Sequence, residues 1–290
     1  MAGMQTAHIV FFSGTGGTAR VAECLRRAFV ARGVDVTKSE LTRGAKPVPS
    51  ADLLVLLYPV YAANAPQPIG EWIATLPQGN GMPVVVISVS GGGEVSPNTA
   101  CRVPTNRALE AKGYHVLYEA MAVMPSNFLE GYSDALSALL LQQATPFAER
   151  IAEEVLSGKT KRIRPIGVDR LLTRLLLVEH FGSRMFGKHL KTNEHCTGCG
   201  WCADHCPRGN ITLTDGRPVF GNRCVLCTRC LYGCPTKAIA PQFVKFAVLK
   251  QGFDLEAVEA RTQAMTEFPP VEELMKGSGY GGVRKYLEGR

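Results

Sequence analysis

Residues 196–207 read CTGCGWCADHCP, and residues 224–235 read CVLCTRCLYGCP. In each segment two residues separate the first cysteine from the second and the second from the third. Three residues separate the third cysteine from the fourth, and proline follows the fourth. The pattern C-x2-C-x2-C-x3-C-P therefore occurs twice, and the second segment is an internal repeat of the first. Eight of the ten cysteines in the chain belong to these two segments.

Cysteines at this spacing are typical of [4Fe–4S] clusters. Three thiolates on a tight loop surround one face of a cubane, and the fourth turns away to reach the other cluster. Structural zinc sites are the alternative, but they favour two separated CxxC or CxxC/HxxxH halves. Residues 192–241 resemble the two-cluster bacterial ferredoxins, which are small α+β domains. The spacing predicts one cluster bound by Cys196, Cys199, Cys202 and Cys234, and a second bound by Cys206, Cys224, Cys227 and Cys230.

The composition limits the class of protein. At 290 residues the chain is long enough for about two domains, and its 46% hydrophobic content is typical of a soluble globular protein. Only Cys24 and Cys101 lie outside the repeats, so no disulfide framework is expected and the cytoplasm is the expected compartment. The N-terminus lacks the basic region of a signal peptide, and the longest apolar run, 53–63, is too short to span a bilayer.

A second informative stretch lies near the N-terminus. The apolar run 7–12 leads into SGTGGT at 13–18, and an apolar stripe at helical spacing follows. A strand, a glycine-rich loop and a helix in this order direct backbone N–H groups toward a phosphate. The loop lacks the lysine of a P-loop, and its fit to a dinucleotide fingerprint, with Asp35 downstream, is weak. Its three hydroxyls suit a terminal monophosphate.

The loop resembles the flavodoxin pattern [ST]-x-T-G-x-T, which binds the phosphate of FMN. Strand patterns at 7–12, 34–41, 52–58, 83–88 and 115–123 alternate with helical patterns, which predicts a flavodoxin-like, doubly wound, five-stranded parallel sheet of the α/β class. Ligands of such sheets lie beyond the carboxyl ends of the strands. In flavodoxins the loops after the third and fourth strands flank the flavin ring, so Tyr61 is expected beside it, although it could equally be a surface aromatic. The resemblance implies that FMN contacts Ser13, Gly14, Thr15, Gly16, Gly17, Thr18, Pro59, Val60, Tyr61, Ala62, Asn64, Ser90, Gly91, Gly92 and Gly93.

We therefore expect four segments: a flavodoxin-like domain at 1–157, a basic helical connector at 158–191, a ferredoxin domain at 192–241 and a helical C-terminal tail at 242–290. Residues 158–193 contain nine Lys or Arg and two acidic residues, a net charge of +7. This segment therefore accounts for the whole net charge of the chain, and the remaining residues sum to zero. The connector could pack its leucine face on a domain and leave its charges in water. It could also dock an acidic redox partner protein, or, less favoured, touch an anionic membrane. Nucleic acid is not expected, because no basic and aromatic residues interleave there.

Together the two halves resemble the flavodoxin–ferredoxin fusion proteins of anaerobic microbes. The segments YPVYAANAP at 58–66 and MPSNF at 124–128 look like loops of that family. The resemblance implies an electron-transfer protein that relays low-potential electrons between two [4Fe–4S] clusters and FMN, to or from a redox partner protein. The alternative is an FMN-dependent reductase that acts directly on a small acceptor. No general acid, general base or nucleophile stands out.

Overall fold

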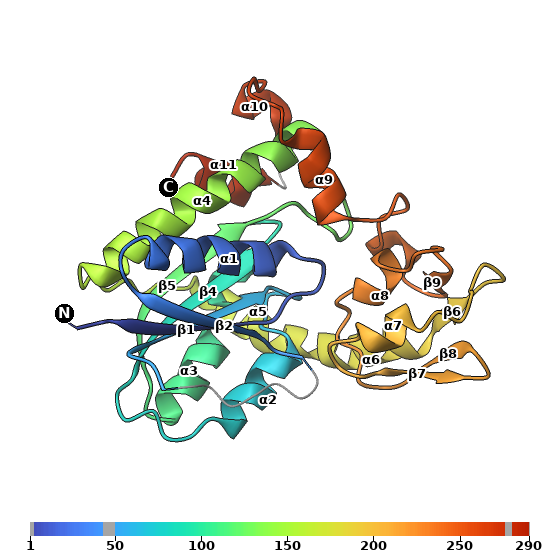
Figure 1. Cartoon of the computed structure of the whole chain (residues 1–290), viewed down its shortest axis with the longest axis horizontal. Helices are drawn as coiled ribbons and strands as arrows, with labels where there is room; N and C mark the ends of the chain where they lie inside the picture. The colour runs from blue at the N-terminus through green and yellow to red at the C-terminus, as the bar shows by residue number, and fades with distance from the viewer. Residues whose placement is uncertain (1–2, 43–49, 276–279, 290) are drawn as a thin grey trace.

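The computed structural model describes residues 3–42, 50–275 and 280–289. The N-terminal half contains a parallel five-stranded sheet in the order β2-β1-β3-β4-β5 (Figure 1). This order, with one reversal at β1/β3, is the flavodoxin-like doubly wound order, so the predicted fold class is confirmed. The strands are β1 Thr6–Phe11, β2 Asp35–Glu40, β3 Leu53–Pro59, β4 Pro83–Ser90 and β5 His115–Val123.

Helices cover both faces of this sheet. On one face, α1 (Gly17–Val30) and α4 (Asp134–Leu156) pack on alternate residues of the strands, while α2 (Gln67–Thr75) and α3 (Val103–Ala111) cover the other face. The β3 run LLVLLY is almost wholly apolar because both of its faces are buried. The short helix η1 (Asn98–Ala100) precedes α3. The carboxyl ends of β1, β3 and β4 therefore emerge together at one edge of a two-sided core.

The cysteine repeats form a smaller unit beside that edge, on the right in Figure 1. Strand β6 (Leu190–Thr192) pairs with β9 (Ile239–Pro241), and β7 (Ile211–Thr214) pairs with β8 (Arg217–Phe220). Asp215 and Gly216 join β7 to β8 with φ of 50° and 71°, the left-handed turn that a tight hairpin requires. An Asp-Gly pair between two short strands is the sequence signature of such a hairpin. Each repeat also contains one short helix, α7 (Trp201–Asp204) or α8 (Arg229–Tyr232).

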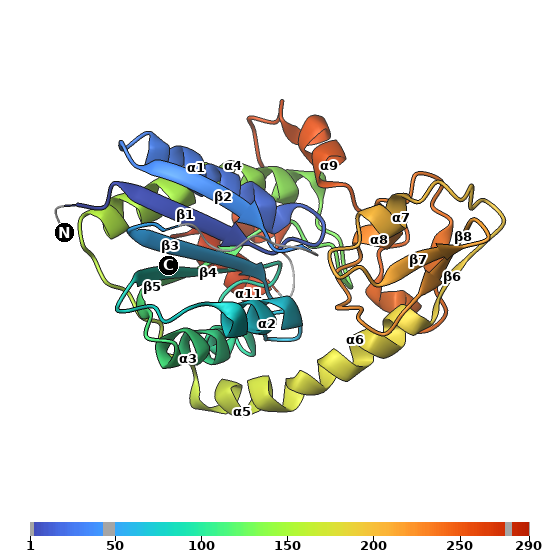
Figure 2. The ribbon, with the colours of Figure 1, turned by 60° about the horizontal axis from the view of Figure 1, so that its bottom comes forward.

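The connector links the two units along one side of the molecule, below α3 and α2 in Figure 2. It consists of α5 (Gly167–Leu175), the 3-10 turn η2 (Leu176–Val178) and α6 (Glu179–Lys188). None of the described helices is both long enough and apolar enough to cross a membrane.

The C-terminal segment returns to the flavodoxin-like unit. After η3 (Lys245–Ala247), α9 (Leu255–Thr262) packs on α4, followed by α10 (Val271–Leu274) and α11 (Gly281–Leu287). Val283 of α11 is fully buried with Val123 and Leu136, and a Cβ on Gly282 would stand 2.2 Å from Gly92 O. Residues 281–287 thus form a helix that packs against β5.

Candidate cofactor sites

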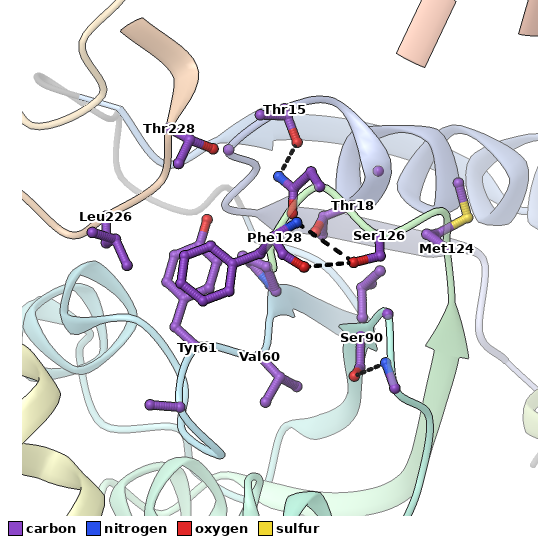
Figure 3. A pocket seen from close by; sticks show the side chains of 18 of the residues that line it. Thr15, Thr18, Val60, Tyr61, Ser90, Met124, Ser126, Phe128, Leu226 and Thr228 are labelled. Carbon is purple, nitrogen blue, oxygen red and sulfur yellow. Dashed lines mark hydrogen bonds between the residues drawn. The ribbon is translucent and has the colours of Figure 1, made fainter. Parts of the chain in front are cut away.

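A cavity of about 440 Å³ lies where β1, β3 and β4 end (Figure 3). This volume is within the range of 300–1,000 Å³ that is usual for small-molecule sites. The structure brings residues of all three loops that the sequence assigned to FMN to this cavity. Among them, the cavity is lined by Ser13, Gly14, Thr15, Gly17, Thr18, Pro59, Val60, Tyr61, Ala62, Ser90, Gly91 and Gly92.

Three residues assigned to FMN do not line this cavity and have other neighbours. Gly16 (φ 99°) precedes α1, and its Cα faces Leu255. The side-chain amide of Asn64 donates to Thr173 O in the connector at 2.9 Å, and a Cβ on Gly93 would lie 2.5 Å from Gly282. These contacts tie the ring loops to the connector and to the tail. Direct FMN contact by the three residues stays a prediction.

The loop 13–18 has the geometry of an anion site. Ser13 and Thr18 are buried, and Ala19 N–H donates to Ser13 Oγ at 3.3 Å. Thr15 Oγ accepts a hydrogen bond from the amide of Asn127 at 2.6 Å. No acidic residue lies in the first turn of α1, whose N-terminal dipole favours a negative group. This end of the cavity can therefore bind a phosphate.

The rest of the cavity suits a flat, largely apolar group. Tyr61, Phe128 and Met124 contribute large side chains to its wall. Gly14 lies where the loop of Tyr61 and the second cysteine repeat come close together. A Cβ on Gly14 would stand 2.7 Å from both Tyr61 Oη and Cys227 O. Hydroxyls and helix amides at one end, with aromatic and aliphatic side chains at the other, fit the phosphate and the ring of FMN.

One wall of the cavity comes from the second cysteine repeat, which the sequence did not reveal. Leu226 and Thr228 both line the cavity, with φ of 55° and 57°. The matching positions of the first repeat are Gly198 and Gly200, with φ of 70° and 80°. A left-handed backbone costs an ordinary residue roughly 1–2 kcal/mol, which glycine avoids. The two repeats thus have the same backbone conformation at these positions, and only the second repeat carries side chains at them. Comparing the two repeats position by position would have signalled this difference. Leu176 and Phe253 complete the wall.

The eight repeat cysteines gather around two smaller cavities. Cys196, Cys199, Cys202 and Cys234 line one of these cavities, and Cys206, Cys224, Cys227 and Cys230 line the other. Each group is the one the spacing predicts, although its role as a ligand set stays a prediction. We call Cys196, Cys199, Cys202 and Cys234 the distal cysteines, and Cys206, Cys224, Cys227 and Cys230 the proximal cysteines.

The surroundings of these thiols fit a metal–sulfur centre. Backbone N–H groups of Asn210, Leu226 and Ala238 donate to cysteine sulfurs at 3.3–3.4 Å, the kind of hydrogen bond that tunes cluster potentials. Burial raises the pKa of Cys224 to about 12 and that of Cys227 to about 11. These thiols keep their protons in neutral water, so a metal centre must displace the protons on binding.

Hydrogen bonds join the proximal repeat to the phosphate loop. Arg229 donates from Nε to Gly14 O at 2.9 Å and from Nη2 to Ser13 O at 2.6 Å, and it also pairs with Glu40. Tyr232 Oη donates to Asn127 O at 2.8 Å. The proximal cavity and the large cavity share Leu226 and Thr228 as lining residues, whereas the distal cavity shares none with the large one. The distal cysteines, the proximal cysteines and the large cavity therefore follow one another in space.

One comparison with known proteins concerns the first cysteine repeat. A family model described as "4Fe-4S binding domain" matches residues 191–212, a match that ends before the second repeat. None of the curated proteins matches the sequence. Residues 191–212 are thus similar to a 4Fe–4S binding domain, and they follow a sheet in the flavodoxin-like strand order.

Several solved flavodoxins are similar to about half of the chain. The flavodoxin of Streptococcus pneumoniae TIGR4 has 20% identity and a TM-score of 0.39, covering 53% of this chain and 99% of its own. The two-electron reduced flavodoxin of Megasphaera elsdenii has 21% identity and a TM-score of 0.36, covering 51% and 98%. A flavodoxin from the domain Archaea has 16% identity and a TM-score of 0.34, covering 52% and 99%.

Proposed function

We propose that the chain is an electron-transfer protein of the flavodoxin–ferredoxin fusion type, which relays low-potential electrons between two [4Fe–4S] clusters and FMN. The observation that carries the proposal is the shared wall: Leu226 and Thr228 line both the cavity of the proximal cysteines and the cavity that fits FMN. A redox partner protein supplies or receives the electrons. The division into 1–157, 158–191, 192–241 and 242–290 belongs to the same proposal.

Each part of the chain has a distinct task in this relay. Loop 13–18 binds the phosphate, and loops 59–62 and 90–92 flank the ring. FMN, when bound, exchanges one or two electrons, and each cluster exchanges one. Arg229 and Tyr232 hold the proximal repeat against loops 13–18 and 124–129, which fixes the separation between the sites. The protein thus contributes distance and orientation, and the cofactors contribute the chemistry.

The distal cysteines are the expected point of contact with the partner protein. Cys199 is exposed, whereas Cys202 is buried. Trp201 and His205 stack beside these cysteines with ring centroids 4.2 Å apart and planes 8° apart, and the Trp201 ring lies over Gly233. A flat aromatic surface next to an exposed cysteine suits a transient redox contact, since such encounters bury little area.

The walls of the large cavity favour a carrier over the reductase alternative. Leu226 and Thr228 of the second repeat, Leu176 of the connector and Phe253 of the tail all line it. These segments come from outside the flavodoxin-like sheet and cover part of the space beyond the ring loops. A small acceptor needs access to the ring, whereas a relay does not.

Anaerobic purification followed by acid release of flavin and iron tests the cofactors. We expect FMN and the iron of two clusters in each chain, and a protein without FMN would contradict our interpretation of loop 13–18. Stopped-flow reduction of the clusters should then be followed by reduction of the flavin within the same chain. Steady turnover of a small acceptor without any partner protein would instead establish the reductase.

A further inference from the structure

The connector helices expose an apolar stripe, which we define as Val168, Leu171, Leu175, Phe181 and Met185. Their exposed fractions are 56%, 56%, 62%, 65% and 39%. If the connector packed its leucine face on a domain, these five side chains would be buried. Because they are exposed, that alternative does not hold for this part of the connector. Single exposed apolar residues are ordinary on protein surfaces, but a row of five along one helical segment is not.

The side of α5 that faces the protein is mostly polar, whereas α6 buries small residues together with the ring of Phe186, which packs in the core of the cysteine-repeat unit. Asp169 is fully buried and accepts hydrogen bonds from Ser96 Oγ at 2.7 Å and Thr99 Oγ1 at 2.5 Å. Thr173 is buried against the loop of Asn64. In α6, Ser183 Oγ donates to Cys224 O at 3.2 Å, and Gly187 packs on Cys224.

In α5 this arrangement inverts the usual pattern of a surface helix, which buries its apolar residues, whereas α6 buries Phe186 and leaves Phe181 and Met185 exposed. The inward contacts are hydrogen bonds, a close glycine contact and the burial of Phe186, and together they hold the connector in this orientation. The apolar stripe is therefore directed outward by the fold, and it is available to something outside the chain.

The stripe is continuous along both helices. Residues advance by roughly 100° in an α-helix and 120° in a 3-10 helix, and the three residues of η2 therefore add an extra rotation of about 60°. With this correction the five stripe residues fall within a sector roughly 80° wide. Without η2, the same five residues would spread over a sector roughly 140° wide. The 3-10 turn thus brings the apolar residues of α6 into line with those of α5.

A row of cations runs along one flank of the stripe. By the same rotation, Arg170, Arg174, Arg184 and Lys188 occupy an adjoining sector roughly 60° wide. All four are exposed. The one acidic residue of α5, Asp169, is on the buried side. The surface beside the stripe is therefore positive along its length.

The apolar surface continues beyond the C-terminal end of α6. The ring of Phe243 lies edge-on to His189, with centroids 5.1 Å apart. Phe243, Val244 and Phe246 are 62%, 45% and 74% exposed, and Lys245 between them is exposed as well. Aromatic and aliphatic side chains with interleaved lysine repeat the chemistry of the stripe.

We propose that the connector stripe lies on an anionic membrane surface, with its apolar side chains among the acyl chains and the basic row at the lipid headgroups. An amphipathic helix with Leu and Phe on one face and Lys or Arg beside it binds a bilayer in this way. A second copy of the chain would bring one row of cations against another. An acidic protein would need a groove matched to five protruding side chains, whereas acyl chains adapt to any apolar shape. This proposal is independent of the relay.

Vesicle co-sedimentation of the full, cofactor-loaded chain tests the proposal. We expect binding to phosphatidylcholine vesicles that contain phosphatidylglycerol, weaker binding to pure phosphatidylcholine, and loss of binding as salt is raised. The double variant L171E/F181E should lose binding. The variant R170Q/R174Q should bind about 25-fold more weakly, because each basic residue near an anionic surface contributes about a fivefold factor.

Matched controls separate the stripe from the overall positive charge. V30E replaces an apolar side chain that is 46% exposed on α1, and R32Q removes an exposed cation beside it. Both should bind as the wild type does, and all variants should keep their iron and flavin. If anionic vesicles leave the wild type in solution at low salt, or if V30E/R32Q loses as much binding as the stripe variants, the proposal is wrong. Stripe-dependent capture of an acidic protein by a chain that ignores vesicles would show that the stripe binds protein.

Discussion

Arg229 is predicted to hold the proximal repeat against the phosphate loop of the flavodoxin-like unit. Replacing it by alanine removes hydrogen bonds to Ser13 O and Gly14 O and the pair with Glu40. Hydrogen bonds from a charged donor contribute about 1.5–3 kcal/mol each, and contributions within one side chain do not add fully. The Arg229 and Glu40 side chains are 20% and 32% exposed, so solvent limits their ion pair to at most about 1 kcal/mol. We therefore expect Arg229→Ala to cost about 3 kcal/mol of docking free energy.

Hydrogen exchange measured by mass spectrometry detects this change. A loss of about 3 kcal/mol makes transient separation of the halves roughly 100-fold more frequent. Protection of the amides in 13–19 and 224–231 should fall by that factor, while protection in β3 and β4 stays the same. Electron transfer from the clusters to the flavin should slow in the same variant.

Arg217→Ala is the matched control. Arg217 also donates to a backbone carbonyl, Asn193 O, at 3.1 Å, but both residues belong to the ferredoxin-like unit. Arg229→Lys keeps the charge and loses the two-pronged contact, so it should fall between the wild type and Arg229→Ala. Unchanged exchange of 13–19 in Arg229→Ala, or an equal change in Arg217→Ala, would refute this view of the interface.

Three further outcomes follow from the structure. Gly14→Ala should lower FMN affinity by at least tenfold, because its Cβ would lie 2.7 Å from Tyr61 Oη and Cys227 O; fluorescence titration with FMN would measure this, and wild-type affinity would contradict it. Cys227→Ser should lose about half of the bound iron and keep the distal cluster; electron paramagnetic resonance would show one remaining cluster signal, and full iron content would remove Cys227 from the ligands. Burial lowers the pKa of His8 below 6.5, so the unfolded chain binds a proton first as pH falls, and folding stability should fall below about pH 6.5. His8→Gln should flatten that slope in urea unfolding, and an unchanged slope would assign it to other groups.

Local patterns were sufficient to predict the architecture. The β3 run LLVLLY predicts a strand buried on both faces, and the loop SGTGGT predicts a glycine-rich turn from a strand into a helix; the structure has both. The hairpin at Asp215-Gly216 follows from turn chemistry in the same way. Each of these features depends on residues that are close in the sequence.

Contacts between distant segments were not predictable in this way. No local rule assigns Arg229 to Gly14, 215 residues away, or places Gly93 against Gly282. The outward direction of Leu171 was also hidden, because helical periodicity identifies an apolar face without saying whether anything covers it. Leu226 and Thr228 look like ordinary variation between ligand cysteines until their positive φ and the adjoining cavity are known.

The path of the chain has a mechanical consequence. The ferredoxin-like unit is an insertion, since the chain leaves the flavodoxin-like unit after α4 and returns to it at α9 and α11. Two covalent tethers, with Arg229 and Tyr232 between them, prevent the inserted unit from swinging as a domain on a single linker would. A single proteolytic cut in the connector would still leave the halves joined through residues 242–254. In the proposed relay, transfer between the sites would occur at fixed separation, so its rate should not depend on protein concentration or on solvent viscosity.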